Sequence, residues 1–422
     1  MKNNSFNSLL KKFNKLHPKF IDLSLKRIFK LLKKLENPHL LLPNIIHIAG
    51  TNGKGSTLSL IKQILINHNY KVDCYISPHL ESIEDRFIIE NKKISKKKLY
   101  KTLKYIEFIN NNEPITFFEI TTAAAFYLFS RSRSDFLILE TGLGGRLDAT
   151  NVIKDSILSI ISPISFDHQE YLGNTLKKIT NEKLAIIKKN SSIVIGKQDK
   201  EIKNYIAKKL KNRKNRKMLY YKNFEIININ NKKFSLDINK KKYYFNKPSL
   251  LGDHQVENAS IAIVASYELK KRGFKIKKNL IDEALKKTKW PGRLEKIRIN
   301  NMYIFLDGAH NIGGAKKLAN FFSNRKKKIW LIIGMLNNKD IYNFLKTLKY
   351  NLEGVIAIKI PKEKNSFTTQ KISNVCKKLN IHCIQKNNFL NAKNYLITKV
   401  KPQTILITGS LYLVGKIRNV LI

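Results

Sequence analysis

Two patterns of apolar residues alternate along the chain. Short, mostly apolar runs such as "NIIHIA" at 44–49 and "FLIL" at 136–139 have the length of buried strands. Between them apolar residues recur at helical spacing, as in the stretches 21–35, 57–69 and 116–132. Strands that alternate with helices are typical of βαβ units, whose parallel strands gather ligands at their carboxyl ends. The pattern therefore predicts an α/β fold with a parallel sheet.

The length of the chain and one Pro-Gly pair predict two domains. The chain has 422 residues, whereas a single hydrophobic core rarely serves more than about 250–300 residues. The pair lies in "TKWPGRLEKI" and marks a hinge. We expect an N-terminal domain at 1–292, with a small inserted sheet at about 218–247 where short β-like runs follow one another. A smaller Rossmann-like α/β domain would occupy 293–422.

The net charge changes this picture little. Lys and Arg number 80 against 31 Asp and Glu, giving a formal charge of +49, and such an excess would suit a nucleic-acid-binding protein. However, the lysines are scattered through every predicted element and mixed with Asn and Ile, all of which have AT-rich codons. A base bias of the genome explains the composition more simply, and no nucleic acid is expected as a partner. The basic field would still attract polyanions such as ATP.

The cysteines and the apolar segments of the chain indicate the cellular compartment in which we expect the protein. Cys74, Cys376 and Cys383 form no CxxC pair and no metal-like cluster, which indicates a reducing compartment. The first residues lack a continuous apolar segment, and no stretch offers about 18 uncharged apolar residues, so no membrane association is expected. We expect a cytoplasmic protein.

The stretch "HIAGTNGKGST" at 47–57 resembles a phosphate-binding loop between a strand and a helix. It departs twice from the pattern GxxxxGK[ST], because Ile48 replaces the first glycine and Gly55 separates Lys54 from Ser56. Its glycines would let backbone N–H groups close on a phosphate, with Lys54 as a point charge and Ser56 or Thr57 as a ligand of Mg²⁺. The alternative is a glycine-rich turn with an exposed lysine.

Three polar side chains follow predicted strands. Glu140 ends "DFLILE", where a carboxylate needs solvent or a cation, and Ser77 and His168 follow two other strands. These side chains could converge on one cation. Alternatively, Glu140 caps the following turn, and His168 lies on the surface, since Mg²⁺ prefers oxygen ligands.

Eight blocks then resemble one enzyme family in their order along the chain: "GTNGKGST", "YISPHL", "TFFEITTAAAF", "LETGLGGRLDATN", "DHQEYLG", "PGRLEKI", "DGAHN" and "ITGSLYLVG". They are similar to the signatures of the bifunctional dihydrofolate synthases/folylpolyglutamate synthases, ADP-forming amide ligases of the Mur ligase superfamily. The extra glycine before Ser56 is this family's form of the loop. Two departures are Ser24 in "DLSL", where the family has glycine, and Ile312, where proline is common.

The resemblance implies roles for the matching residues. ATP would contact Gly53, Lys54, Gly55, Ser56, Thr57, Asn258, Arg293 and Asp307. Mg²⁺ would be bound by Ser77, Glu140, His168 and Lys183. The pterin substrate would contact Thr116, Phe117, Phe118, Glu119, Leu147, Asp148 and Ala149. Glutamate would lie near His310 and Ser410.

Lys183 is implied only by its matched position. The family carries this lysine as a carbamate, which is reasonable because an ammonium group with a pKa near ~10.4 repels Mg²⁺, whereas a carbamate can bind it. Without the match, Lys183 would be one surface lysine among many.

The implied reaction joins L-glutamate to 7,8-dihydropteroate, to reduced folates, or to both, with ATP as co-substrate and Mg²⁺ as cofactor. The carboxylate would be phosphorylated to an acyl phosphate, which the glutamate amine then attacks, with His310 as a candidate base. The alternatives are a Mur-like ligase acting on another carboxylate, an enzyme with folylpolyglutamate synthase activity alone, and a nucleic-acid-binding P-loop protein. The family resemblance favours a monomer.

Overall fold

The chain forms two compact units. The computed structural model describes residues 3–19, 21–299, 301–323 and 327–422. Contacts between Cα atoms group Met1–Pro248 with Val256–Thr288, and Ser249–Gln255 with Lys289–Ile422. The predicted domain boundary between 292 and 293 lies close to this division and stays a prediction. Across the described ranges, no helix combines the length and the apolar character needed to cross a membrane.

The first unit is built on an eight-stranded sheet in the order β4-β3-β2-β5-β1-β6-β7-β8. The six strands from β2 to β8 in this order are parallel, whereas β3 and β4 form an antiparallel edge. The strands are β1 (Asn44–Ala49), β2 (Val72–Tyr75), β3 (Phe87–Ile89), β4 (Lys92–Lys93), β5 (Phe136–Glu140), β6 (Leu158–Ile161), β7 (Ser192–Ile195) and β8 (Lys217–Leu219). The parallel sheet predicted from the apolar runs is confirmed.

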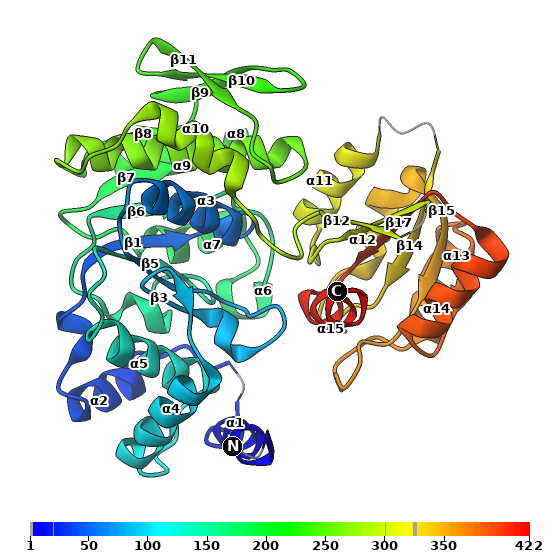
Figure 1. The fold of residues 1–422 in the computed structure, drawn as a ribbon, viewed down its shortest axis with the longest axis horizontal. Helices are drawn as coiled ribbons and strands as arrows, with labels where there is room; N and C mark the ends of the chain where they lie inside the picture. Colours follow the sequence, from blue (N-terminus) through cyan, green and yellow to red (C-terminus); the bar gives the residue numbers. More distant parts are fainter. Residues whose placement is uncertain (1–2, 20, 300, 324–326) are drawn as a thin grey trace. The chain divides into compact units, whose positions relative to one another are not determined.

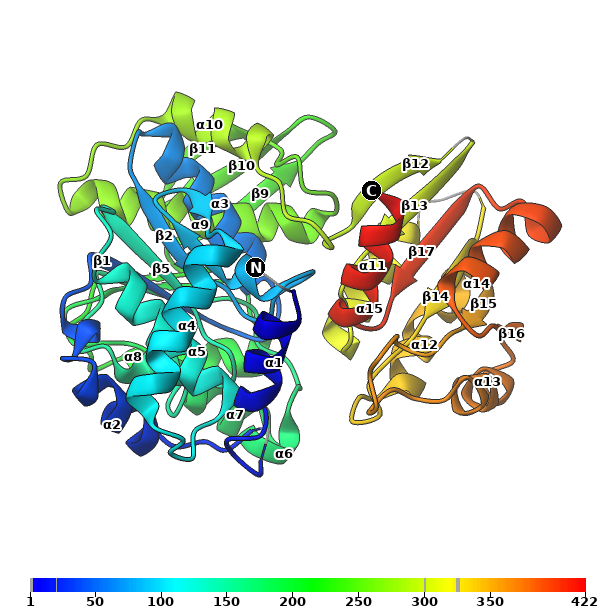
Figure 2. The ribbon, with the colours of Figure 1, turned by 60° about the horizontal axis from the view of Figure 1, so that its bottom comes forward.

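Helices cover both faces of this sheet. They are α1 (Asn3–Phe13), α2 (Lys26–Lys34), α3 (Lys54–Asn67), α4 (Lys96–Asn110), α5 (Phe117–Phe129), α6 (Gln169–Leu172), α7 (Leu176–Leu184), α8 (Lys200–Leu210), α9 (Asp253–Lys271) and α10 (Lys278–Lys287), with 3-10 turns η1 (Pro38–Leu40), η2 (Ile83–Arg86) and η3 (Ala149–Val152). One face carries α1, α2, α4 and α5, which share an apolar core with β1, β2 and β5 (Figure 2). Helix α3 contacts the same strands and packs against α10. A second core joins α7 and α8 to β6 and β7.

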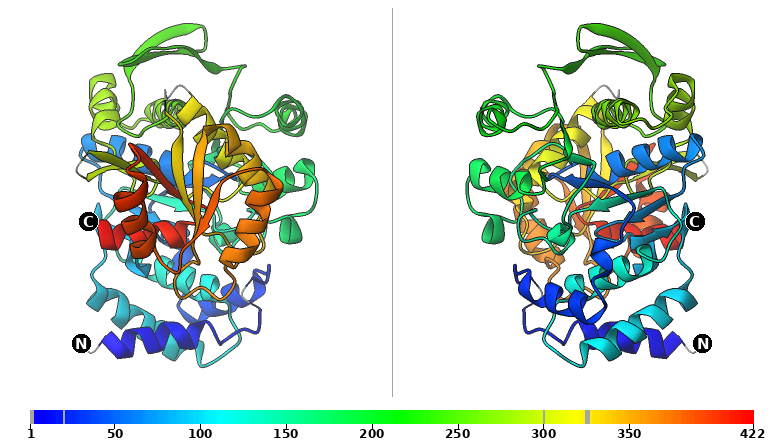
Figure 3. Two further views of the ribbon diagram at one scale, coloured as in Figure 1. Left: turned by 90° about the vertical axis from the view of Figure 1, so that its right-hand side faces the viewer. Right: turned by 90° about the vertical axis from the view of Figure 1, so that its left-hand side faces the viewer.

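A separate three-stranded antiparallel sheet follows the large one in sequence. It consists of β9 (Phe224–Ile229), β10 (Lys233–Ile238) and β11 (Lys241–Asn246), and it lies beside α10 (Figure 3). The predicted insertion began near residue 218, but β8 pairs with β7 and belongs to the large sheet. Sequence could not separate the two, since both read as short β-like runs.

The second unit is a six-stranded sheet in the order β12-β13-β17-β14-β15-β16, parallel except for β12 (Figure 1). Its strands are β12 (Glu295–Ile299), β13 (Met302–Leu306), β14 (Ile329–Ile333), β15 (Leu352–Ala357), β16 (Cys383–Gln385) and β17 (Thr404–Thr408). Its helices are α11 (Ile312–Ser323), α12 (Ile341–Leu348), η4 (Lys349–Asn351), α13 (Thr369–Lys378), α14 (Phe389–Tyr395), the π-helix η5 (Leu396–Val400) and α15 (Leu411–Leu421). Helices α11, α12 and α13 share an apolar core with the sheet, and α15 contacts β17. The predicted smaller α/β domain is confirmed as a fold class.

Helix α2 begins later than its apolar spacing predicted. The spacing starts at Ile21, but the helix starts at Lys26, whose backbone N–H donates to the Ser24 hydroxyl at 3.2 Å. Arg27 holds the preceding turn through the carboxylate and the carbonyl oxygen of Asp22. Ser24, which replaces the family's glycine, therefore stabilises the turn before α2.

Candidate active site

The turn between β1 and α3 has the geometry of an anion-binding loop. Gly53 precedes α3 with a φ of 86°, a value that glycine adopts without strain. The loop is held in place because the backbone N–H groups of Thr51 and Asn52 donate to the Pro163 oxygen at 3.0 and 3.1 Å. The first N–H groups of a helix lack intrahelical acceptors and attract anions. The sequence prediction of a strand, a glycine loop and a helix is thus confirmed.

Two lysines meet at the carbonyl oxygen of Gly50. Lys54 Nζ, from the first residue of α3, lies 3.2 Å from this oxygen, and Lys183 Nζ, from α7, lies 3.0 Å from it. Lys183 is only 4% exposed. Burial, and then the charge of Lys54, lower the pKa of Lys183 to about 7. The neutral amine is therefore far more populated at neutral pH than in an exposed lysine.

Asn258 and two hydroxyl groups complete the surroundings of the loop. A Cβ atom on Gly53 would lie 2.4 Å from Asn258 Oδ1, so α9 brings this amide directly against the loop. Ser56 and Thr57 are buried in the first turns of α3. Within the described ranges the Thr57 hydroxyl has no hydrogen-bond partner. An unsatisfied buried hydroxyl is costly, and it marks a place where a ligand would be favourable.

Gly53→Ala is expected to weaken the binding of an ATP analogue at least about tenfold, because a methyl group would push Asn258 away and strain the loop. Titration calorimetry measures the affinity. Gly273→Ala is a matched control, since Gly273 has a φ of 95° but no atom within 4 Å of its Cβ position. Equal nucleotide affinity of the two variants would show that the contact between Gly53 and Asn258 is unimportant.

Ser77 and Glu140 lie together at the carboxyl ends of two neighbouring parallel strands, β2 and β5. The backbone N–H of Ser77 donates to Glu140 Oε2 at 3.3 Å, and Glu140 is 5% exposed. The Ser77 hydroxyl accepts a hydrogen bond from Arg86 Nη1 at 3.4 Å. A hydroxyl and a carboxylate predicted as metal ligands are thus neighbours.

His168 directly precedes α6 and has a left-handed conformation, with a φ of 50°. Its backbone N–H donates to Asp167 Oδ1 at 3.0 Å. In the part of the chain that the structure describes, no group of three or more His, Cys, Asp or Glu side chains could hold a metal ion. The predicted set contains only two such side chains, Glu140 and His168, so its convergence stays a prediction.

The residues present nevertheless fit Mg²⁺. This ion takes oxygen ligands, keeps several waters and needs few protein donors. Ser77 and Glu140 provide two adjacent oxygen donors, and the Thr57 hydroxyl lies buried in the first turn of α3, after the loop, without a partner among the described residues. Lys183 would add an oxygen donor only as a carbamate.

Two of the residues predicted to contact the pterin stabilise a helix end, and their contact with the pterin stays a prediction. Thr116 and Glu119 form a capping box at the start of α5, in which each side chain accepts from the other's backbone N–H. Glu119 Oε2 also lies 3.1 Å from Arg27 Nε. Both residues are buried, so within "TFFE" the partly exposed side chains are those of Phe117 and Phe118.

Arg86, at the end of η2, is a candidate site residue that the sequence did not indicate. Its guanidinium group lies over the rings of Phe117 and Phe118, 5.8 and 5.9 Å from their centroids, and it donates to His79 Nδ1 at 3.0 Å. Arg86 is 6% exposed and has no carboxylate partner in the described part of the chain. Buried arginines are almost always paired with an anion. The sequence alone could not indicate this contact, because Phe117 lies more than 30 residues from Arg86 and the two meet only in the folded chain.

The segment "LDA" at 147–149, like "TFFE", contains both buried and partly exposed residues. Leu147 is partly exposed, whereas Asp148 and Ala149 are buried. The Asp148 carboxylate accepts from the backbone N–H groups of Leu143 and Thr150 at 2.7 and 3.0 Å. Burial raises the pKa of Asp148, and these hydrogen bonds oppose the rise. Asp148 therefore organises its own loop.

In the second unit, the predicted residues Arg293 and Asp307 gather at the carboxyl end of β13. Asp307 accepts from the backbone N–H groups of Leu294 and Ala309 at 2.8 and 2.9 Å. A Cβ atom on Gly308 would lie 2.5 Å from Arg293 Nη1, which places the guanidinium group against this turn. Burial raises the pKa of Asp307, and the Arg293 charge opposes the rise.

His310 and Ser410 belong to neighbouring turns, after β13 and β17. The turns are joined because Gly409 N and the Thr408 hydroxyl both donate to the Ala309 oxygen. His310 Nδ1 lies 2.9 Å from the Gly308 oxygen, so this nitrogen carries the proton and Nε2 is the basic nitrogen of the neutral ring. Ser410 caps α15 by accepting from Tyr412 N. The turns that carry His310 and Ser410 are thus held together by hydrogen bonds.

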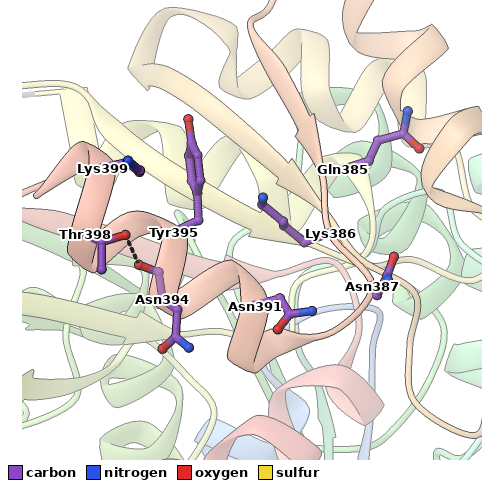
Figure 4. A pocket seen from close by; sticks show the side chains of 8 residues that line it. All are labelled: Gln385, Lys386, Asn387, Asn391, Asn394, Tyr395, Thr398 and Lys399. Atoms are coloured by element: carbon purple, nitrogen blue, oxygen red, sulfur yellow. Dashed lines mark hydrogen bonds between the residues drawn. The ribbon is translucent and has the colours of Figure 1, made fainter.

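A surface pocket of about 510 Å³ lies elsewhere in the second unit, between the end of β16 and α14 (Figure 4). Its polar lining includes Lys386, Tyr395 and Lys399, and Lys386 Nζ lies 4.5 Å from the centre of the Tyr395 ring. None of its lining residues is a predicted site residue. The chemistry inferred from sequence therefore does not use this pocket.

Comparison with known proteins identifies relatives over nearly the whole chain. Family models match the Mur ligase middle domain over residues 48–266 and the dihydrofolate synthetase C-terminal domain over residues 292–420. The dihydrofolate synthase/folylpolyglutamate synthase of Bacillus subtilis is 32% identical over 417 residues, covering 94% of each chain. The dihydrofolate synthetase of Saccharomyces cerevisiae is 30% identical over 353 residues, covering 80% of this chain and 81% of the relative.

A solved structure of a relative has the same fold over nearly the whole chain. That of E. coli FolC in complex with DHPP and ADP superimposes with a TM-score of 0.87 at 25% identity, covering 98% of this chain and 97% of the other. The resemblance inferred from the eight sequence blocks is confirmed. The chain belongs to the dihydrofolate synthase/folylpolyglutamate synthase family of Mur-type ligases.

Proposed function

We propose that the protein is an ATP-dependent, ADP-forming ligase that adds L-glutamate to 7,8-dihydropteroate and to reduced folates. The observation that carries the proposal is the meeting of Lys54 and Lys183 at the Gly50 oxygen, beside a helix N-terminus suited to phosphate. The names of the relatives support the substrates, and the ADP and DHPP of the E. coli complex support a nucleotide and a second ligand.

ATP is proposed to bind with its phosphates at the N-terminus of α3. The Lys54 side chain and the N–H groups of Gly53, Lys54, Gly55 and Ser56 would hold them, with Asn258 supporting the loop. In the second unit, Arg293 and Asp307 are proposed as further ATP contacts. Arg293 supplies a cation and Asp307 keeps its turn in place, as their hydrogen bonds indicate.

Mg²⁺ is proposed as the cofactor, held by Ser77, Glu140, His168 and carbamylated Lys183. When bound, it would offset the negative charge of the ATP phosphates. The lowered pKa of the buried Lys183 amine supports the carbamate, because only the neutral form of an amine attacks CO₂. Formation of the carbamate joins the amine nitrogen to the carbon of CO₂ and releases one proton.

Two residues of the chain, Lys54 and His310, are proposed to act in the two chemical steps of the reaction. A carboxylate oxygen of the pterin substrate attacks the γ-phosphorus of ATP, the bond to the bridging oxygen breaks, and ADP leaves; Lys54 offsets the charge. The glutamate amine then attacks the acyl phosphate, and phosphate leaves as the amide forms. His310 is proposed to accept the proton of the amine at Nε2, because Nδ1 is engaged by Gly308. Ser410 is proposed to help bind glutamate.

Phe117, Phe118 and the segment Leu147–Ala149 are proposed to line the pterin site, with the buried Arg86 beside the two rings. A cation with no carboxylate in reach among the described residues would favour an anionic group of the substrate. The carboxylate that becomes phosphorylated is such a group. Thr116, Glu119 and Asp148 would act on this site indirectly, through the helix end and the loop that they hold.

Arg86→Met is expected to raise the KM for dihydropteroate at least about tenfold, because a charge-assisted hydrogen bond to the substrate is lost. Steady-state kinetics at saturating ATP and glutamate measure it. Arg131→Met is a matched control, because Arg131 also stacks on an aromatic ring, at 3.7 Å from Tyr127, but is exposed. An unchanged KM in Arg86→Met would remove Arg86 from the substrate site.

The proposed function is tested by ADP release from purified protein given ATP, dihydropteroate and L-glutamate. Release that requires both co-substrates supports the ligase. ATP hydrolysis that is stimulated by nucleic acid and does not depend on dihydropteroate would contradict the ligase. It would favour the nucleic-acid-binding alternative. Release with a different carboxylate acceptor would favour a Mur-like ligase.

A second candidate is an enzyme with only one of the two activities. The relative from B. subtilis is named for both, whereas that from S. cerevisiae is named for dihydrofolate synthesis alone, and their identities to this chain are similar, at 32% and 30%. Mass analysis of products formed with dihydropteroate and with tetrahydrofolate, offered separately, decides between them. The monomeric state and the cytoplasmic location stay predictions.

A further inference from the structure

A buried histidine in β1 lies directly before the phosphate-binding loop. His47 is fully buried, and the alternation along β1 turns it toward the same face as Ile45, which is covered by α5 and its neighbours. Its Nε2 atom lies 2.9 Å from the hydroxyl oxygen of Thr150 in η3. None of the roles described so far uses this histidine.

Proton counting fixes the direction of the hydrogen bonds. The Thr150 hydroxyl donates its single proton to Asp148 Oδ1 at 2.5 Å, so its oxygen must accept from His47 Nε2. His47 is therefore a neutral ring with its proton on Nε2, and burial supports this by lowering its pKa to about 3. Its Nδ1 atom is buried and has no hydrogen-bond partner in the described ranges. A proton on Nδ1 would leave two lone pairs facing each other at Thr150.

The chain of hydrogen bonds ends on the loop between β5 and η3. Asp148 accepts from Leu143 N near the start of this loop and from Thr150 N after its end, so it closes the loop. Between these points, a Cβ atom on Gly145 would lie 2.5 Å from the Glu182 oxygen and 3.2 Å from the Lys183 Cα atom. The loop is thus packed against the helix that carries Lys183.

The same loop also meets the aromatic segment. A Cβ atom on Gly142 would lie 2.5 Å from the Phe118 ring, which in turn stacks on Tyr75 at 5.9 Å between centroids. A shift of the loop would therefore move Phe118 and α7 together. Because such packed contacts leave no free space, a hydrogen bond that holds the loop also holds both neighbours.

We propose that His47 is a positioning residue, which acts through Thr150 and Asp148 to hold the Gly142–Ala149 loop against Phe118 and Lys183. The inference rests on the proposed function, because it assigns the loop to the pterin substrate. A merely structural role would stabilise the fold without affecting one substrate more than another. The proposal instead requires a selective effect on the pterin substrate.

The test compares His47→Gln, whose amide can donate at the position of Nε2, with His47→Met, which has a similar size and no donor. His47→Met is expected to raise the KM for dihydropteroate at least about tenfold and by a larger factor than the KM for ATP, while His47→Gln keeps the low KM for dihydropteroate. Thr150→Val and Thr150→Ser form a second pair with the same expectation, which serves if His47→Met does not fold. Equal effects on both substrates, or equal effects of Gln and Met, would overturn the proposal.

Two further measurements do not depend on turnover. Nitrogen NMR is expected to show His47 as the neutral Nε2–H form; a proton on Nδ1 would overturn the assignment. Hydrogen exchange at the amides of Leu143 and Thr150 is expected to be at least about tenfold faster in His47→Met than in His47→Gln. If the wild-type protein does not use dihydropteroate as a substrate, but the NMR and hydrogen-exchange measurements give the expected results, the proposed function is contradicted. The positioning of the loop by His47 is then still supported. Unchanged exchange in His47→Met would refute the positioning itself.

Discussion

Lys54→Ala is expected to lower the rate of ADP formation about a hundredfold to a thousandfold and to leave the fold intact. Lys54 is the first residue of α3, and its ammonium group reaches the Gly50 oxygen at the place where the phosphates of ATP are proposed to lie. Removing one preorganised donor at a developing charge has effects of this size. A coupled ADP assay with dihydropteroate and glutamate measures the rate, and thermal unfolding checks the fold.

Lys62→Ala is the matched control, because Lys62 lies on the same helix, away from the loop. It is expected to retain normal turnover. Lys54→Ala has a second expected effect: since the Lys54 charge lowers the pKa of Lys183, its removal should raise that pKa. Normal turnover of Lys54→Ala would show that the loop does not bind the reacting phosphates.

The sequence was sufficient for features that one segment determines by itself. The run "NIIHIA" became β1, the glycines after it became a loop, and Lys54 began a helix, because each depends on local spacing and on the conformations open to glycine. The adjacency of Ser77 and Glu140 also followed, since both end strands of one parallel sheet. Lys183 came only from the resemblance, because its contact with Gly50 spans 133 residues.

Features that depend on side chains from distant segments could not be predicted. Arg86 becomes notable only because α5 places Phe117 and Phe118 under its guanidinium group. Glu119 matched a substrate-contacting position, yet its carboxylate caps α5 and pairs with Arg27. In both cases the sequence shows the residue type, and only the packing shows whether a charge meets a partner inside the protein.

Lys183→Met is expected to abolish ADP formation and to make the folded protein more stable at pH 7 and below. Lys183 has a pKa of about 7 in the folded protein against 10.5 in an unperturbed chain. Between these values the unfolded state binds more protons, so the free energy of unfolding of the wild-type protein rises with pH. Below pH 7 the buried ammonium group lowers stability by at most about 5 kcal/mol, and methionine removes this penalty.

The stability gain should therefore shrink as the pH rises from 7 toward 10.5. Thermal unfolding of the wild-type protein and of Lys183→Met, in buffer freed of CO₂, measures this difference across the range. Lys188→Met is a useful comparison, because burial also lowers the pKa of Lys188, but this side chain donates to Asn151 and has no proposed role in catalysis. A gain for Lys183→Met that is the same at pH 6.5 and pH 10 would show that folding does not lower the pKa of Lys183, so that the side chain stays protonated in the folded protein across this range.

The burial that makes the Lys183 ammonium group unfavourable also favours its neutral amine, which carbamate formation needs. A pKa of about 7 in place of 10.5 raises the neutral fraction of the amine at pH 7 about a thousandfold, and only this fraction forms a carbamate. We therefore expect activity to fall when CO₂ is removed and to return with bicarbonate, whereas Lys183→Arg should stay inactive at any CO₂ level. Carbon NMR with labelled bicarbonate would detect the carbamate directly. Activity that does not depend on CO₂ would contradict the carbamate and would leave Lys183 as an amine beside Lys54, where Asp167, Asp148 and Glu182 partly offset the repulsion between the two lysines.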